Sequence, residues 1–179
     1  MWPYVPVAPQ RAAGISFEQS RILFVLCGNH IVVEAGVVKA EWEFEQVVEC
    51  NAPRRLCWRY WTDIANWDDP PAKFSLEASF ADGSRITTEL PGQTLVSVIR
   101  DVREGRAATI EVGLPNALFS FHWSFDDLEG DRTRIGQRLV LSGEDAASFL
   151  DQAKVMGKNA PEGVKKLIAA MERAHLTEA

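Results

Sequence analysis

Residues 41–67 read EWEFEQVVECNAPRRLCWRYWTDIANW, and this stretch decides the fold. From Glu41 to Cys50, charged residues alternate with apolar or neutral ones. One face therefore carries Trp42, Phe44, Gln46, Val48 and Cys50, and the other carries mostly glutamates. A period of two with one charged face predicts a strand over 41–50 that packs on one side only.

A short helix is predicted directly after this strand, over residues 53–62. Asn51 is the expected N-cap, and Pro53 suits the first turn. The helix would place its apolar side chains on one face by i, i+3, i+4 spacing: Leu56, Cys57, Tyr60, Trp61 and Ile64. A second short helical turn is expected over 64–67, ending at the sequence Asp68-Asp69-Pro70-Pro71, where a helix cannot continue.

Six further strands are predicted downstream, near 73–80, 84–90, 94–102, 106–114, 117–126 and 132–142. Their connections are short and rich in turn residues, such as Ala81-Asp82-Gly83 and Pro91-Gly92. Short links between successive strands indicate an antiparallel meander.

A long helix is predicted from Glu144 to Ala174, with an apolar stripe that includes Phe149, Met156 and Leu167. Pro161 interrupts it, so either the helix kinks there or two helices meet, the first ending at Asn159 or Ala160. Gly157 would allow close approach to the sheet, and Pro161 offers a hinge or a simple kink.

Composition limits the classes of function. A net charge of −6 and a pI near 5.1 argue against nucleic-acid binding and stable membrane insertion. The three cysteines, Cys27, Cys50 and Cys57, contain no C-x-x-C pair, which favours reduced thiols and a cytoplasmic protein. A single disulfide between two of them is the alternative. The three histidines lack metal-ligand spacing, so neither a metal nor a cofactor is expected.

The N-terminal 39 residues do not follow the pattern of the rest of the chain. An apolar run over 22–27 is too short to span a bilayer. Two alternatives are open: an extra hairpin with Gly28-Asn29 in its turn, or a translation start at a GUG codon for Val37 or Val38. We therefore divide the chain into an N-terminal extension of uncertain status (1–39) and a ligand-binding domain (40–179).

The order strand, two short helices, six-strand meander and long C-terminal helix resembles the helix-grip superfamily (SRPBCC), which includes START and Bet v 1-like proteins. The bacterial polyketide cyclase/dehydrase-like proteins are the most similar group. The residues that carry this resemblance are Ala52-Pro53, Trp58, Thr62-Asp63-Ile64-Ala65-Asn66-Trp67, Phe80-Ala81-Asp82-Gly83-Ser84, Pro91-Gly92, Leu114-Pro115, Thr133-Arg134 and Ser142-Gly143. The resemblance implies an α+β fold in which a curved seven-stranded antiparallel sheet and the C-terminal helix enclose an apolar cavity.

The predicted strand over 117–126 carries an alternating aromatic row of Phe119, Phe121, Trp123 and Phe125. Burying such a row is worth about 2–3 kcal/mol per side chain, so it should face inward. His122 then points outward, as an exposed surface histidine rather than a catalytic base. Relatives often carry a cavity-side histidine on this strand, and Trp123 would take its place.

The predicted ligand-binding residues share an inward direction and apolar or neutral polar character. They are Trp42, Phe44, Tyr60, Trp61, Phe74, Phe119, Phe121, Trp123, Gln137, Phe149 and Met156. An apolar wall with a few hydrogen-bonding groups is typical of a ligand pocket. The alternative is that these side chains pack against each other as a solid core.

Three functions are compatible with this pattern. The first is binding or transport of a small hydrophobic molecule, such as a lipid, a polyketide or an aromatic metabolite. The second is a cyclase or dehydratase, which an inward Asp101 or Glu111 would favour, although outward positions are expected for both. The third is a partner-binding module. No catalytic residue is assigned, and the sequence indicates neither the ligand nor the oligomeric state.

Overall fold

A computed structural model describes residues 40–67 and 70–178 of the chain. The strands are β1 (Ala40–Cys50), β2 (Lys73–Leu76), β3 (Arg85–Leu90), β4 (Gln93–Arg103), β5 (Ala107–Leu114), β6 (Ala117–Leu128) and β7 (Arg132–Gly143). The helices are α1 (Arg54–Thr62), the short 3-10 helices η1 (Ile64–Asn66) and η2 (Ala146–Phe149), and α2 (Leu150–Glu178). Both alternatives for residues 1–39 lie outside the described residues.

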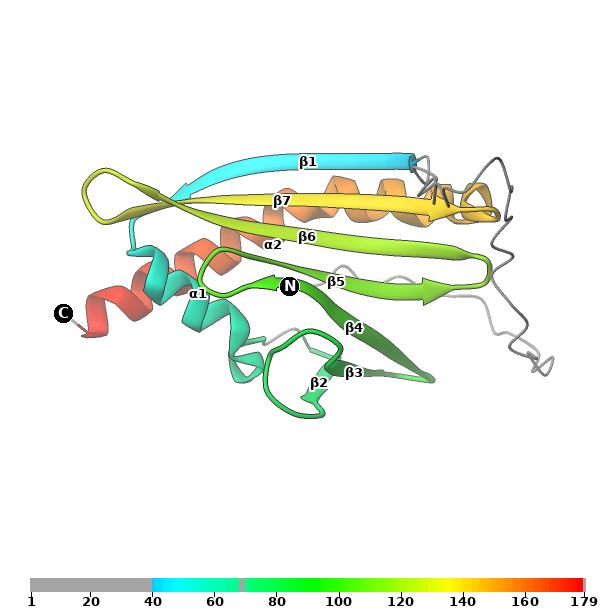
Figure 1. The fold of residues 1–179 in the computed structure, drawn as a ribbon, viewed down its shortest axis with the longest axis horizontal. Coiled ribbons are helices and arrows are strands. Elements are labelled where there is room, and N and C mark those ends of the chain that lie inside the picture. The colour runs from blue at the N-terminus through cyan, green and yellow to red at the C-terminus, as the bar shows by residue number, and fades with distance from the viewer. Residues whose placement is uncertain (1–39, 68–69, 179) are drawn as a thin grey trace, which may run out of the picture.

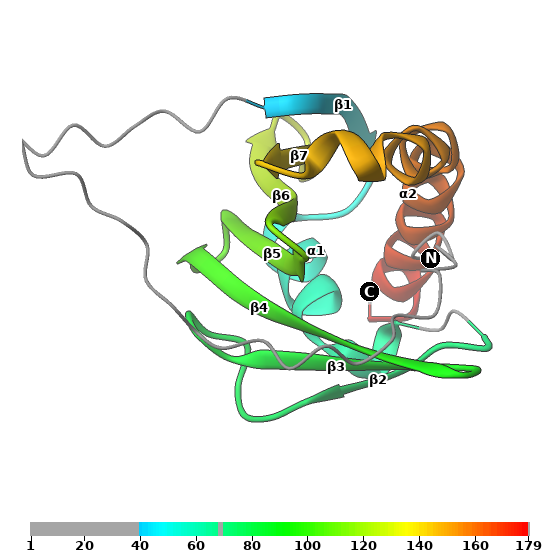
Figure 2. The ribbon, with the colours of Figure 1, turned by 90° about the vertical axis from the view of Figure 1, so that its right-hand side faces the viewer.

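The seven strands form one antiparallel sheet in the order β1-β7-β6-β5-β4-β3-β2. The sheet curls so that β2 and β3 turn away from β1 (Figure 1), and α2 lies on the concave side (Figure 2). The predicted helix-grip arrangement of sheet, short helices and C-terminal helix is therefore confirmed.

Strand β1 shows which face of the sheet is the inner one. Burial alternates along it, with the glutamates exposed and Trp42, Phe44, Gln46 and Val48 partly buried. A Cβ added to Gly157 of α2 would lie 2.7 Å from Cζ2 of Trp42, so the helix backbone rests on this indole. The face that carries Trp42 is therefore the face that α2 covers, here called the inner face.

The start of α1 differs from the prediction. Pro53, not Asn51, is the N-cap residue, and no side chain caps the helix. Asn51 instead donates from its backbone and side-chain nitrogens to Oε1 of Glu172 on α2, at 2.8 and 2.9 Å. Because this residue serves the distant helix, the prediction of an N-cap at Asn51 was wrong.

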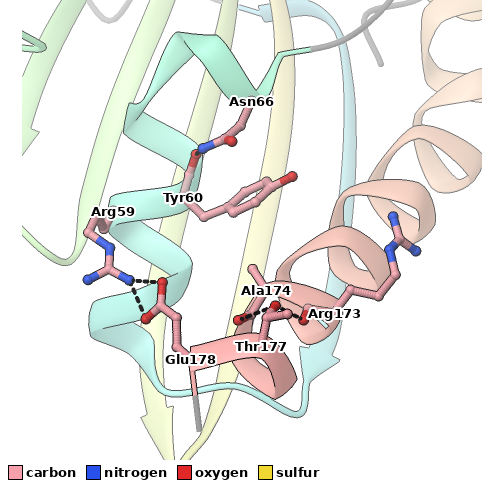
Figure 3. A network of polar contacts seen from close by, with 7 residues as sticks. All are labelled: Arg59, Tyr60, Asn66, Arg173, Ala174, Thr177 and Glu178. Carbon is pink, nitrogen blue, oxygen red and sulfur yellow. Dashed lines mark hydrogen bonds and ion pairs between the residues drawn. The ribbon is translucent and has the colours of Figure 1, made fainter.

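Helix α2 is continuous through Pro161, so of the two alternatives for this segment the second, a first helix that ends at Asn159 or Ala160, was wrong. A proline within a helix removes one backbone hydrogen bond, but packing of a buried stripe can compensate for that loss. Ala160 and Val164 on either side are 6% and 2% exposed, so the helix is held against the protein at this point. At its end, Glu178 accepts two hydrogen bonds from Nη2 of Arg59 in α1, at 2.5 and 2.6 Å (Figure 3).

Helices α1 and η1 are fixed to the sheet by aromatic packing. The Trp61 ring lies 5.4 Å from the rings of both Trp123 and Phe125, measured between centroids. Nε1 of Trp67 donates to the backbone oxygen of Trp61 at 2.7 Å. This cluster occupies one end of the inner face and leaves Tyr60, on the same helix, pointing towards α2 (Figure 3).

Strand β2 ends at Leu76, earlier than the predicted residue 80. The chain leaves the sheet because the Asp82-Gly83 turn folds it onto β4, where the Gly83 amide donates to the carbonyl of Ile99 at 2.8 Å. Gly83 has φ +81°, a conformation that favours glycine.

Candidate ligand-binding site

Four cross-strand rows of side chains form the centre of the inner face. The row of Trp42 continues through Leu141, Phe119, Val112 and Ser97, and the row of Phe44 through Leu139, Phe121, Ile110 and Ile99. The row of Gln46 continues through Gln137, Trp123 and Ala108, and the row of Val48 through Ile135 and Phe125. These rows hold no carboxylate and no histidine, so the face is apolar apart from a few neutral groups.

Aromatic stacking connects β1 to the middle of the sheet. The rings of Trp42 and Phe119 lie 6.2 Å apart and nearly parallel, and those of Phe119 and Phe121 lie 4.8 Å apart. Phe119, Phe121 and Trp123 are buried, at 4%, 3% and 7% exposure, so the central part of the predicted wall is well packed.

The outer parts of the predicted wall are packed less completely. Trp42, Phe44, Tyr60, Phe74 and Phe149 are only partly buried, although each packs on the core. These residues come from β1, α1, β2 and η2, which surround the concave side. By contrast, Trp61 is 2% exposed within the aromatic cluster and Met156 of α2 is 9% exposed. The predicted residues therefore divide into a closed centre and a partly open margin.

Polar groups on the inner face lie mainly in the row of Gln46. Nε2 of Gln46 donates to Oε1 of Gln137 at 2.7 Å, and Gln137 is buried. Beside it in register, the indole Nε1 of Trp123 is buried without a hydrogen-bond partner among the described residues. Sequence reasoning identified Gln46 and Gln137 as inward amides, but it treated Trp123 only as part of the apolar wall.

A second unpartnered polar atom belongs to α2. Oε1 of Gln152 is buried and has no hydrogen-bond partner in the described part of the chain. Its neighbours in the helix include the buried Ala153 and Met156. The sequence pattern did not single out Gln152, because a lone glutamine beside an apolar stripe is ordinarily a solvated residue.

The two acids considered for catalysis lie on the outer face. Asp101 is exposed at a bulge in β4 with φ +51°, and Glu111 pairs with Arg100 at 3.5 Å. Neither side chain is available to a molecule on the inner face.

His122 also lies on the outer face, as predicted, but it is not a freely exposed residue. It lines a hollow of about 550 Å³ together with Thr109, Ser124, Gly136 and Arg138. Its Nδ1 lies 3.0 Å from Oγ1 of Thr109, and burial followed by the nearby Arg138 lowers the pKa of His122. The hollow forms because alanine, serine and glycine occupy one outer row, a feature that alternation alone does not reveal.

Cys50 and Cys57 lie together where β1 meets α1. Both are free and fully buried, and their Sγ atoms are 3.7 Å apart. The hydrogen bond to Cys57 and burial raise the pKa of Cys50, so this thiol is held protonated. The nearby Thr133 hydroxyl donates to the carbonyl of Ala52 at 2.7 Å, so both of these buried polar groups have a hydrogen-bond partner.

The described residues contain neither a cluster of metal-ligand side chains nor a membrane-spanning helix. Within 40–67 and 70–178, no group of histidine, cysteine, aspartate and glutamate side chains could hold a metal ion. Over the same ranges, no helix is both long and apolar enough to cross a bilayer.

No protein-family model matches the sequence, and neither does any curated protein. Solved structures, however, share the arrangement of strands and helices. The aromatase/cyclase ZhuI from Streptomyces sp. R1128 is 18% identical with a TM-score of 0.55, and the match covers 74% of this chain and 94% of that one. Ara h 8.0201 is 15% identical with a TM-score of 0.56, covering 76% of this chain and 98% of its own.

A START superfamily protein from Mycobacterium smegmatis is also similar, at 16% identity and a TM-score of 0.53, with 76% of this chain and 99% of that one covered. The chain therefore has the helix-grip fold of the SRPBCC, Bet v 1-like and START-like proteins, as its sequence predicted. At these identities the likeness concerns the fold alone, and the function has to be argued from the residues.

Proposed function

We propose that the protein binds a small hydrophobic molecule between the concave inner face of the sheet and α2. The observation that carries this proposal is the partial exposure of inward-facing aromatic side chains from separate elements, notably Trp42, Tyr60 and Phe74. Aromatic residues on the covered side of a sheet bury most of their large surface, and apolar area left exposed around one concavity by several elements favours a ligand.

The chemistry of the inner face favours binding over catalysis. Proton transfer requires a titratable group within hydrogen-bond reach of the substrate. The four central rows supply only amide, hydroxyl and indole groups, and Asp101 and Glu111 lie outside. An aromatase/cyclase is among the similar structures, but its activity depends on its own side chains, which this fold does not supply by itself.

A matched pair of substitutions tests whether the ligand binds on the inner face of the sheet. Val112 of β5 points to the inner face beside Phe119, whereas Val96 of β4 points outward and is 47% exposed. Val112→Trp would fill space on the concave side, and Val96→Trp would add the same side chain on the opposite side of the same sheet.

The probe is N-phenyl-1-naphthylamine, a neutral molecule whose fluorescence rises in apolar surroundings. We expect saturable binding with one molecule per chain, weakened about tenfold or more by Val112→Trp, or about 1.4 kcal/mol, and unchanged by Val96→Trp. Melting curves establish that both variants fold. An absence of binding to the unaltered protein, or equal binding by the two variants, would exclude the proposed site.

A further inference from the structure

The row that contains Gln46 differs from the other rows of the inner face, because three neighbouring side chains in it carry polar atoms. In register across β1, β7 and β6 these are Gln46, Gln137 and Trp123. The rows on either side present only aliphatic and aromatic groups at these three strands, such as Phe44 and Phe125. The row is thus a polar band across an apolar surface.

The hydrogen bonds of this band leave one buried donor unpaired. Nε2 of Gln46 donates to Oε1 of Gln137 at 2.7 Å. Nε1 of Trp123 is the only buried polar side-chain atom of the band without a partner in the described part of the chain. An amide pair can turn over and present either atom, but an indole nitrogen can only donate.

The unpaired indole N–H is costly to the folded protein. A buried donor without a partner has given up its hydrogen bonds to water and gained none in return, and such groups are uncommon in native structures. Trp123 is 7% exposed and packs against Trp61 at 5.4 Å, so this N–H is shielded from bulk solvent. An acceptor supplied by a bound molecule would remove this cost.

The surroundings define what kind of acceptor fits. No Lys or Arg side chain stands in the four central rows, so a carboxylate or phosphate would be desolvated without a counter-charge. A neutral oxygen loses far less on leaving water. The flat rings of Trp61, Phe121 and Trp123 around the band suit a planar apolar body.

We infer that the ligand is a planar, mainly apolar molecule with a neutral carbonyl oxygen, which accepts a hydrogen bond from Nε1 of Trp123, with the Gln46–Gln137 amide pair beside it. This inference rests on the proposed function. In this structure protein atoms cover Nε1, so the carbonyl reaches it only after neighbouring side chains shift. Gln46, the partly exposed member of the band, is the side chain with room to move.

Two probes of nearly equal size test the inference: 2-acetylnaphthalene, which has a carbonyl oxygen, and 2-ethylnaphthalene, which lacks one. Their dissociation constants are measured by calorimetry for the unaltered protein, for Trp123→Phe, and for Trp58→Phe as a control. Phenylalanine keeps an aromatic ring at position 123 and removes the donor together with part of the ring area, a loss of size that Trp58→Phe reproduces. Trp58 belongs to the same aromatic cluster, 5.6 Å from Trp61, but lies outside the polar band.

We expect Trp123→Phe to reduce the preference for the acetyl compound at least about tenfold, and Trp58→Phe to leave it unchanged. If both naphthalenes bind and Trp123→Phe does not alter their ratio, the inference fails while the proposed function stands. If neither binds the unaltered protein, the proposed function itself fails.

A measurement on the unaltered protein covers the case in which Trp123→Phe does not fold. The indole N–H resonance of Trp123 should move downfield with 2-acetylnaphthalene and not with 2-ethylnaphthalene, because a new acceptor deshields the proton. An equal response to the two compounds would overturn the assignment of Trp123 as the donor.

Discussion

The contact between Gly157 and Trp42 predicts the outcome of adding a single methyl group to α2. A Cβ at position 157 would lie 2.7 and 2.9 Å from Cζ2 and Cη2 of Trp42, and 3.4 Å from Cβ of Phe44. Contacts below 3 Å require the indole or the helix to shift, and overpacking of this kind costs about 1–3 kcal/mol. Alanine also gains up to about 1 kcal/mol over glycine within a helix.

The net expectation for Gly157→Ala is a loss of about 1 kcal/mol, which lowers the melting temperature by roughly 2–4 °C for a domain of this size. The assay is urea or thermal unfolding followed by circular dichroism. Lys158→Gly at the exposed neighbouring position measures the local helix propensity independently.

The same substitution in a Trp42→Phe background identifies the cause. Phenylalanine lacks the two indole atoms nearest to position 157, so alanine there should now stabilise the protein by about 0.5–1 kcal/mol. A change of sign between the two backgrounds is the expected result. Equal effects in both would refute the claim that α2 rests on the Trp42 indole.

Three further predictions concern groups outside the four central rows of the inner face. The folded state lowers the pKa of His122, so the free energy of unfolding should keep its full value above about pH 6.5 and decrease as the pH drops below that value. His122→Gln should flatten this part of a plot of melting temperature against pH. In a Cys27→Ser background, the buried Cys50 and Cys57 should react with Ellman's reagent at least about a hundredfold more slowly than in denaturant, and fast labelling of the folded protein would contradict their burial. Thr133→Val, which keeps the shape but leaves a backbone carbonyl without its hydroxyl donor, should lower the free energy of unfolding by about 1–2 kcal/mol in urea titrations, and no loss would show that the bond is dispensable.

The sequence predicted the fold well because its signals are local and repeated. Alternation in β1 and β6 and the turn residues between strands determine which side chains face inward, and these assignments agree with the register and burial. The errors arose where a side chain bonds to a residue that is distant in the sequence. The sequence around Asn51 is typical of an N-cap, but in the fold this residue donates its hydrogen bonds to Glu172 of α2.

The candidate site was less predictable than the fold. That Gln137 faces inward followed from the period of its strand, but the missing partner of Trp123 depends on the positions of every neighbouring side chain. The half-burial of His122 likewise follows from cross-strand neighbours, since the hollow it lines requires small residues on three strands to come into register. No single-sequence pattern records such coincidences.

The charged side of β1 has a consequence for self-association. β1 is an edge strand of 11 residues, and in the described part of the chain no strand pairs with its other side. If two copies joined antiparallel through this edge around Glu45, Glu41 of each would stand opposite Glu49 of the other, and the two Glu45 carboxylates would meet. Like charges directly opposite each other disfavour such pairing. The outer glutamates thus disfavour a continuous sheet shared by two copies of the chain, and each copy keeps a separate curved sheet around its own α2.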